Sequence, residues 1–191
     1  SGGKGDDYIY TWNNDFSDNR NGINGSITYA SGGEGNDNIN VNYYKTALLQ
    51  GDAGDDDLYA NSVQASTLNG GAGSDQLSAY IHNYKTRYTS GERTAAVQSV
   101  LDGGEGNDKL TVSGNADSNY GRVDITANGG AGNDEITVTA HGAGTTQLSG
   151  NRYGFASVAI DGGDGADKIR VSGGLQVNIT TGAGSDTVEL T

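Results

Sequence analysis

Eight aspartates of this 191-residue chain occupy the sixth position of a repeated nonapeptide, Gly-Gly-x-Gly-x-Asp-x-(apolar)-x. The copies begin at residues 2, 32, 51, 70, 103, 129, 162 and 181, and their aspartates are Asp7, Asp37, Asp56, Asp75, Asp108, Asp134, Asp167 and Asp186. Asp52 replaces the second glycine of the third copy, and Thr181 replaces the first glycine of the eighth. Carboxylates stacked in register about 5 Å apart repel one another by about 1 kcal/mol even in a water-like dielectric. A column of them therefore requires a cation between its members.

Calcium fits this column best, because it takes six to eight oxygen ligands from carboxylates and backbone carbonyls. The glycines of the motif can adopt positive φ, which lets the backbone turn its carbonyl oxygens toward an ion. Stacking all the copies leaves up to about seven gaps, each with room for one shared calcium ion. Besides the aspartates, the predicted metal site comprises Gly3, Gly5, Gly33, Gly35, Gly54, Gly71, Gly73, Gly104, Gly106, Gly130, Gly132, Gly163, Gly165, Gly182 and Gly184.

The spacing of apolar residues predicts the elements that hold these corners in place. Successive motifs start between 19 and 33 residues apart, and the shortest spacing corresponds to one complete coil. Apolar residues stand at the eighth and tenth motif positions, and two and four residues before each later motif, which predicts two short strands per coil. Stacked coils make an all-β fold, a right-handed parallel β-roll or β-helix solenoid of about eight coils, with one corner per coil and a thin aliphatic core.

The nonapeptide resembles the repeat of the RTX (repeats-in-toxin) calcium-binding β-roll family. The resemblance covers nearly the whole chain. It implies a parallel β-roll, calcium bound between turns by the sixth-position aspartates and the carbonyls of the glycine turn, type I secretion, and folding only after export. Because this chain has one motif per coil and not tandem nonapeptides, calcium is expected along one edge only. In this respect it is similar to some RTX adhesins and surface-layer proteins.

The variation in length falls at the opposite edge, in excursions over Trp12–Gly25, Ile81–Ala95, Gly114–Arg122 and Ala140–Gly154 that are rich in tyrosine and arginine. They either cover the open edge of the roll or bind a carbohydrate or a protein. The polar residue before each motif either caps the turn or adds a ligand oxygen. The fifth motif position includes Ala166, so no essential metal role is expected there.

Composition excludes several function classes. The chain has no cysteine, a net charge of −13 and a pI near 4.2, which disfavours thiolate chemistry, nucleic acids and anionic membranes as partners. No apolar run approaches the ~20 residues that span a bilayer, so no membrane insertion is expected. Only two histidines are present and no nucleophile accompanies them, so no enzyme is predicted.

Residues 1–191 are therefore interpreted as a single calcium-binding β-roll. Neither end shows the polar cap that solenoids need, which suggests a fragment of a larger protein whose neighbouring repeats continue the stack, or which self-assembles. The favoured function is a calcium-dependent structural or adhesive module of a secreted bacterial cell-surface protein, of adhesin or surface-layer type. The alternative is a non-catalytic targeting or folding module of a secreted enzyme or toxin.

Overall fold

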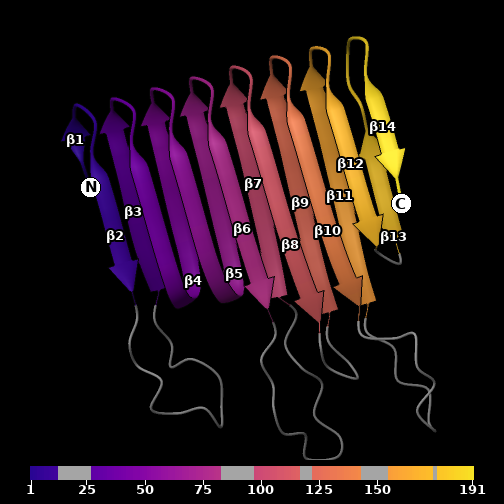
Figure 1. Cartoon of the computed structure of the whole chain (residues 1–191), viewed down its shortest axis with the longest axis horizontal. Helices are drawn as coiled ribbons and strands as arrows, with labels where there is room; N and C mark the ends of the chain where they lie inside the picture. The colour runs from indigo at the N-terminus through magenta and orange to yellow at the C-terminus, as the bar shows by residue number, and fades with distance from the viewer. Residues whose placement is uncertain (13–26, 83–96, 117–121, 143–154, 174–175) are drawn as a thin grey trace, which may run out of the picture.

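The computed structural model describes residues 1–12, 27–82, 97–116, 122–142, 155–173 and 176–191, and these form one parallel sheet folded back on itself (Figure 1). Its strands are β1 (Gly3–Lys4), β2 (Tyr8–Trp12), β3 (Ile27–Glu34), β4 (Asn38–Ala53), β5 (Asp57–Ala72), β6 (Gln76–His82), β7 (Val97–Glu105), β8 (Lys109–Ala116), β9 (Arg122–Ala131), β10 (Glu135–Gly142), β11 (Phe155–Asp164), β12 (Lys168–Gly173), β13 (Gln176–Thr180) and β14 (Thr187–Leu190). The prediction of an all-β parallel roll is confirmed. The number of coils stays a prediction, because most returns between strands lie outside the described residues.

Two walls face each other across the core. Wall 1 contains the strands that follow a corner, namely β2, the first part of β4 and of β5, and then β6, β8, β10, β12 and β14. Wall 2 contains the strands that lead into a corner, namely β1, β3, the second part of β4 and of β5, and then β7, β9, β11 and β13. The walls meet at the glycine-rich corners, which lie side by side along one edge of the molecule (Figure 1).

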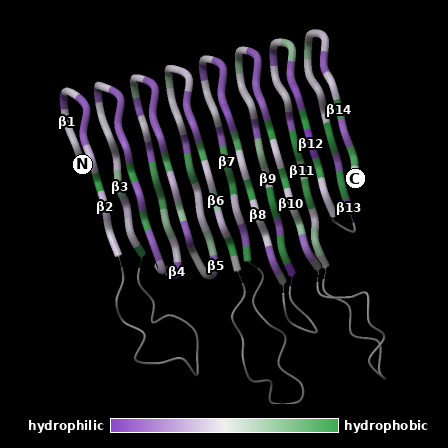
Figure 2. Tube along the Cα trace, in the orientation of Figure 1, coloured by the Kyte–Doolittle hydropathy of each residue, from purple (hydrophilic) through white to green (hydrophobic). Residues whose placement is uncertain are grey.

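The register aligns the predicted apolar positions in rows along the stack. In wall 1 one row contains Ile39, Leu58, Leu77, Leu110, Ile136 and Ile169, all with no exposed surface. In wall 2 the facing row contains Leu49, Leu68, Leu101, Ala127 and Ile160. Burying such a side chain contributes roughly 1.5–3 kcal/mol, and each coil obtains this burial only from its neighbours. Figure 2 shows the hydrophobic residues along the strands and the hydrophilic ones at the corners.

The predicted inward rows run along the whole stack, but burial is lower in the last coil. Val188 and Leu190 continue the inward rows of Ile169 and Val171, as expected, but they are 42% and 64% exposed. This coil packs against a neighbour on one side only, so half of its contacts are missing. Within the core, the buried hydroxyls of Ser66 and Ser99 hydrogen-bond each other at 2.9 Å, which satisfies two polar groups among aliphatic ones.

The two edges of the roll differ in how much of them the structure describes. A compact return occurs at Tyr43 (φ 62°), and the pairing with β5 shifts on either side of Tyr44. The four long excursions fall largely outside the described residues, at 13–26, 83–96, 117–121 and 143–154, as does 174–175. Their covering or binding roles therefore stay predictions. Among the described residues, no helix is long and apolar enough to cross a membrane.

Candidate metal centre

The corner backbone has the conformation that the glycine pattern predicts. Every second- and fourth-position glycine of the predicted site has a positive φ, and the second-position residues of successive coils pair in register. A Cβ on Gly104 would lie 2.1 Å from the carbonyl oxygen of Gly71, so the coils stack too closely for a side chain there. Asp52 holds the same position with φ 78°, the one departure from glycine in this row.

The motif aspartates form a ladder along the corner edge. Oδ1 of each aspartate from Asp37 onward accepts a hydrogen bond from the backbone N–H of the aspartate one coil earlier, at 2.7–3.1 Å. The backbone carbonyl of each aspartate accepts from the residue after the next aspartate, as in Asn38 N–H to Asp7 O at 2.9 Å. The backbone N–H, the carbonyl and Oδ1 are thus all committed to neighbouring coils.

The second carboxylate oxygen of these residues has no partner. Oδ2 is buried without a hydrogen bond in Asp7, Asp37, Asp56, Asp75, Asp108, Asp134 and Asp167. Six of the aspartates, all but Asp7, are only 2% exposed. A buried carboxylate oxygen with neither proton donor nor cation is costly, and a row of them is rare in native proteins. These oxygens are therefore the acceptors that a cation at the corners would use.

Each unpaired Oδ2 points at a small cradle beside the first glycine of its own motif. A Cβ built on Gly51 would lie 2.2 Å from Oδ2 of Asp56 and 2.5 Å from the carbonyl oxygen of Gly70 in the next coil. The same pair of oxygens, one carboxylate and one carbonyl, meets at Gly2, Gly70, Gly103, Gly129 and Gly162. A side chain at the first position would fill this space, which explains why glycine is needed there.

Burial sets the electrostatics of the column. Desolvation, with a smaller contribution from neighbouring aspartates, raises the pKa of Asp56, Asp75 and Asp134 from 3.8 to about 6. Burial also raises the pKa of Asp108, against the hydrogen bond from Asp75 that lowers it. The protein alone thus destabilises the negative charge of these groups, and a nearby cation would reverse that effect.

These residues fit calcium. Among the described residues, no three His, Cys, Asp or Glu side chains gather closely enough to hold a metal ion between them. A bound ion would therefore take carboxylate oxygens from the motif aspartates and complete its shell with backbone carbonyls, which is a mixed oxygen set typical of calcium. The carbonyls of the first-position glycines lie beside Oδ2 and would join those of the second and fourth glycines that the motif predicted.

The fifth motif position has a structural role that the sequence did not reveal. Its side-chain oxygen accepts the backbone N–H of the fifth residue in the next coil, for example Asp55 N–H to Asn36 Oδ1 at 2.9 Å and Ala166 N–H to Asn133 Oδ1 at 2.8 Å. This polar ladder runs in the opposite sense to the aspartate ladder. These hydrogen bonds link neighbouring coils through the fifth-position side chains.

The polar residues before each motif bond along the stack. Ser31 Oγ lies 2.7 Å from Oδ2 of Asp52, and Asn128 Nδ2 donates to Oδ1 of Asp102 at 2.9 Å. Both contacts join neighbouring coils at the side-chain level. None of the described contacts of these residues places a side-chain oxygen beside Oδ2 of a motif aspartate.

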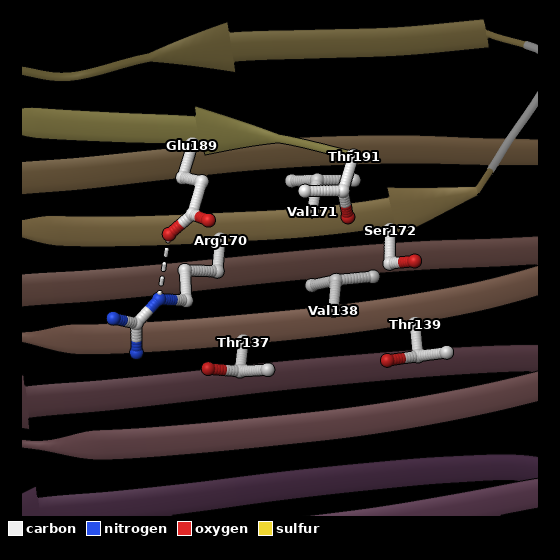
Figure 3. A pocket seen from close by; sticks show the side chains of 8 residues that line it. All are labelled: Thr137, Val138, Thr139, Arg170, Val171, Ser172, Glu189 and Thr191. Atoms are coloured by element: carbon white, nitrogen blue, oxygen red, sulfur yellow. Dashed lines mark hydrogen bonds and ion pairs between the residues drawn. The ribbon is translucent and has the colours of Figure 1, made fainter.

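A hollow beside β10, β12 and β14 contains none of the predicted metal residues (Figure 3). It is lined by Thr137, Val138, Thr139, Arg170, Val171, Ser172, Glu189 and Thr191. Nε of Arg170 donates to Oε2 of Glu189 at 3.0 Å within it. The ion pair is exposed and contributes little to stability.

The comparisons with known proteins agree with the corner chemistry. The RTX calcium-binding nonapeptide repeat matches four segments, residues 48–62, 65–82, 99–121 and 126–138. These segments contain the third to sixth motifs, with Asp56, Asp75, Asp108 and Asp134. No curated protein and no solved structure matches the chain. The resemblance to the RTX family is thereby confirmed.

Proposed function

The chain carries RTX calcium-binding nonapeptide repeats, and from this premise we propose that it is a calcium-dependent structural or adhesive module of a secreted bacterial cell-surface protein. Repeats of this family imply a calcium-binding module of a secreted protein. The proposal adds that the module folds on meeting calcium outside the cell, after type I secretion, and that it belongs to an adhesin or surface-layer protein. It carries out no catalysis of its own.

The observation that carries this proposal is the row of seven buried, unpaired Oδ2 atoms from Asp7 to Asp167. Six of the seven lie beside a backbone carbonyl of the next coil, so the residues that would hold calcium are the motif aspartates together with the glycine carbonyls of the same and the next corner. Calcium would supply positive charge between carboxylates that otherwise repel. The aspartates orient toward it through the hydrogen bond that fixes Oδ1.

Coupling between metal and folding supports a role outside the cell. The chain is only 33% hydrophobic and has a net charge of −13, so burial of apolar surface alone does not offset the conformational entropy of ordering it. Binding energy released at several corners becomes folding energy. A module of this kind remains unfolded where calcium is scarce and becomes a rigid rod where calcium is abundant, which suits a structural spacer on a cell surface.

Circular dichroism with and without calcium tests the proposal. In excess chelator we expect the spectrum of an unfolded chain, and millimolar calcium should restore a β spectrum. Isothermal titration calorimetry under the same conditions then counts the ions bound per chain. A β spectrum that persists in excess chelator would contradict the proposal, because the corners would then be stable without metal.

A further inference from the structure

The outer side of wall 1 carries a cluster of aromatic and amide side chains near its first strands. Tyr10, Asn40 and Tyr59 are adjacent in one row of the register, and Trp12, Asn42, Asn61 and Tyr80 are adjacent in the next. They alternate along their strands with buried residues such as Ile39 and Val41, so they face outward. Together with Tyr43, these residues are called the aromatic face.

Neighbouring rings of the aromatic face lie close to one another; Tyr10 and Trp12 are exposed, whereas Tyr43, Tyr59 and Tyr80 are half-buried. The ring centroids of Tyr10 and Trp12 are 6.5 Å apart, and those of Trp12 and Tyr43 are 5.3 Å apart. Tyr10 is 48% exposed and Trp12 is 51% exposed. Partial burial, followed by the proximity of Tyr43 and Tyr80, raises the pKa of the Tyr59 phenol, in keeping with the closeness of these three rings. An exposed group of large rings on a soluble protein marks a binding surface.

Tyr43 reaches this group through an unfavourable backbone. It is one of two described non-glycine residues at positive φ, and a bulky side chain in that region is an outlier. The pairing of β4 with β5 shifts on either side of Tyr44, next to it. The ring of Tyr43 thereby comes to rest on Trp12. Backbone strain retained beside a cluster of partly exposed rings is typical of a functional surface.

Charge distinguishes the aromatic face from its surroundings. Its side chains are all neutral, whereas the row nearer the corners contains Asp57 and Lys109. Farther along the stack the same outer rows reach Arg170 and Glu189 (Figure 3). The chain as a whole has a net charge of −13. An uncharged surface on such a chain favours binding of an uncharged partner. A second copy of the chain or an anionic polymer would bring further negative charge toward this protein.

We propose that the aromatic face binds a neutral polysaccharide, with sugar rings stacked on Tyr10, Trp12 and Tyr59. The C–H faces of a pyranose ring pack on aromatic rings, and the amides of Asn40, Asn42 and Asn61 offer both donors and acceptors to sugar hydroxyls. The inference deepens the proposed adhesive function by naming its partner. It rests on that function, but a different part of the molecule carries it.

The single tryptophan of the chain, Trp12, reports directly on this surface. The calcium-saturated protein is titrated with cellohexaose, maltohexaose, mannohexaose and chitohexaose while Trp12 fluorescence is recorded, and calorimetry gives the affinity. We expect at least one of these neutral oligosaccharides to shift the emission. Tyr59→Ala and Tyr80→Ala should each weaken that binding at least tenfold. Tyr29→Ala removes an equally large exposed ring from wall 2 and should leave the affinity unchanged.

Four outcomes overturn the inference. In the first, no neutral hexaose changes Trp12 emission at millimolar concentration, and in the second an anionic hexauronate binds more tightly than the neutral sugars. In the third, the main effect of Tyr59→Ala is a loss of self-association. In the fourth, Trp12 is already shielded from acrylamide quenching before sugar is added. Circular dichroism of every variant in calcium shows that its fold is intact. If calcium-dependent folding is observed while sugar binding fails, the proposed calcium function survives and only this inference is lost.

Discussion

Asp108 divides its carboxylate between two tasks. Oδ1 accepts the N–H of Asp75 at 2.8 Å and so links two coils, while Oδ2 is buried with no partner. The first contact requires only an oxygen acceptor, but the second position requires charge neutralisation. The two tasks can therefore be separated by an amide, which keeps the acceptor and removes the charge.

Asp108→Asn should raise the calcium concentration needed for half-maximal folding, because it removes a charged ligand from the middle of the stack. In excess chelator the same variant should be closer to folding than the wild type, since an uncharged side chain avoids the repulsion and desolvation of a buried carboxylate. Asp186→Asn is the matched control at the last corner, where Thr181 carries the side chain that the cradle excludes elsewhere. It should shift the calcium midpoint less. Equal shifts in calcium-monitored circular dichroism would argue against ions shared between coils.

Stability without calcium should depend on pH in an unusual direction. Burial raises the pKa of Asp56, Asp75 and Asp134 to about 6 in the folded chain, from 3.8. The folded state therefore binds more protons than the unfolded state, so calcium-free stability is greatest below about pH 4 and falls as the pH rises through 6. The calcium midpoint should rise as pH falls below 6, because protons compete for the same oxygens. Calcium-free stability that increases between pH 4 and pH 6 would contradict this assignment.

Asp52 is strained in a row otherwise occupied by glycine. With φ 78° it adopts a conformation that costs a non-glycine residue roughly 1–2 kcal/mol. Asp52→Gly relieves this strain but also removes the exposed contact with Ser31. The net expected gain in the free energy of unfolding in calcium is about 1 kcal/mol. Gly71→Ala is the converse change in the next coil, where a Cβ would lie 2.1 Å from the Asp52 carbonyl oxygen, and it should destabilise. Urea titration of both variants in saturating calcium measures the difference.

At the scale of the elements, each corner is joined to the next by two side-chain ladders of opposite sense. The aspartate ladder accepts N–H groups from the coil before it, and the fifth-position ladder accepts them from the coil after it. Opposed ladders resist sliding of one coil over another in either direction. Register is thus fixed at the corners as well as by the alternating apolar residues of the strands.

The fifth-position ladder can be tested at its weakest step. Asn133 accepts the N–H of Ala166 at 2.8 Å, but Ala166 has no side-chain oxygen to offer to Ser185. Asn133→Ala should lower the free energy of unfolding in calcium by about 1 kcal/mol, and Ala166→Asn should raise it by a similar amount. Ser185→Ala, in the last described coil, is the control and should change little. If urea titrations show an unchanged free energy of unfolding for both test variants, the fifth-position ladder does not contribute to stability.

Most of the strand arrangement follows from the sequence because two signals coincide. Glycine clusters mark each corner, and apolar residues alternate on both sides of it, so Leu58 and Leu68 could be assigned to facing rows before their pairing was known. The sense of the ladders could not be predicted, since it depends on which neighbour each side chain reaches. The first-position glycines were missed for a related reason, because the cradle beside Gly51 is completed by a carbonyl from another coil.

The aromatic face was also beyond sequence reasoning. Outward positions follow no hydrophobic period, and Tyr10, Tyr59 and Tyr80 lie in separate coils whose returns differ in length. Only the register shows that they share one surface. The composition of the tyrosine- and arginine-rich excursions predicted a binding surface there. The described rings of wall 1 form a second surface that could bind a carbohydrate.

At the scale of the whole molecule, charge repulsion and the shortage of apolar surface both oppose the calcium-free fold. With a net charge of −13 and 33% hydrophobic residues, the chain should be expanded in chelator, with a radius of gyration of about 47 Å for 191 residues. In calcium the stacked roll should be far smaller, though above the ~16 Å of a spherical domain because it is elongated. Small-angle X-ray scattering measures both states.

The cause of that compaction can be separated from simple charge screening. Magnesium carries the same charge as calcium, but it prefers a smaller octahedral shell and releases its waters reluctantly. A corner that offers buried carboxylate and carbonyl oxygens, and no water-filled cage, should therefore fold with calcium and remain expanded in an equal concentration of magnesium. Sodium chloride at matched ionic strength screens the repulsion between exposed charges without entering the cradles, so it should also leave the chain expanded. If either salt compacts the chain as fully as calcium does, neutralisation of the net charge is sufficient, and the unpaired Oδ2 atoms are not the reason that the protein needs its metal.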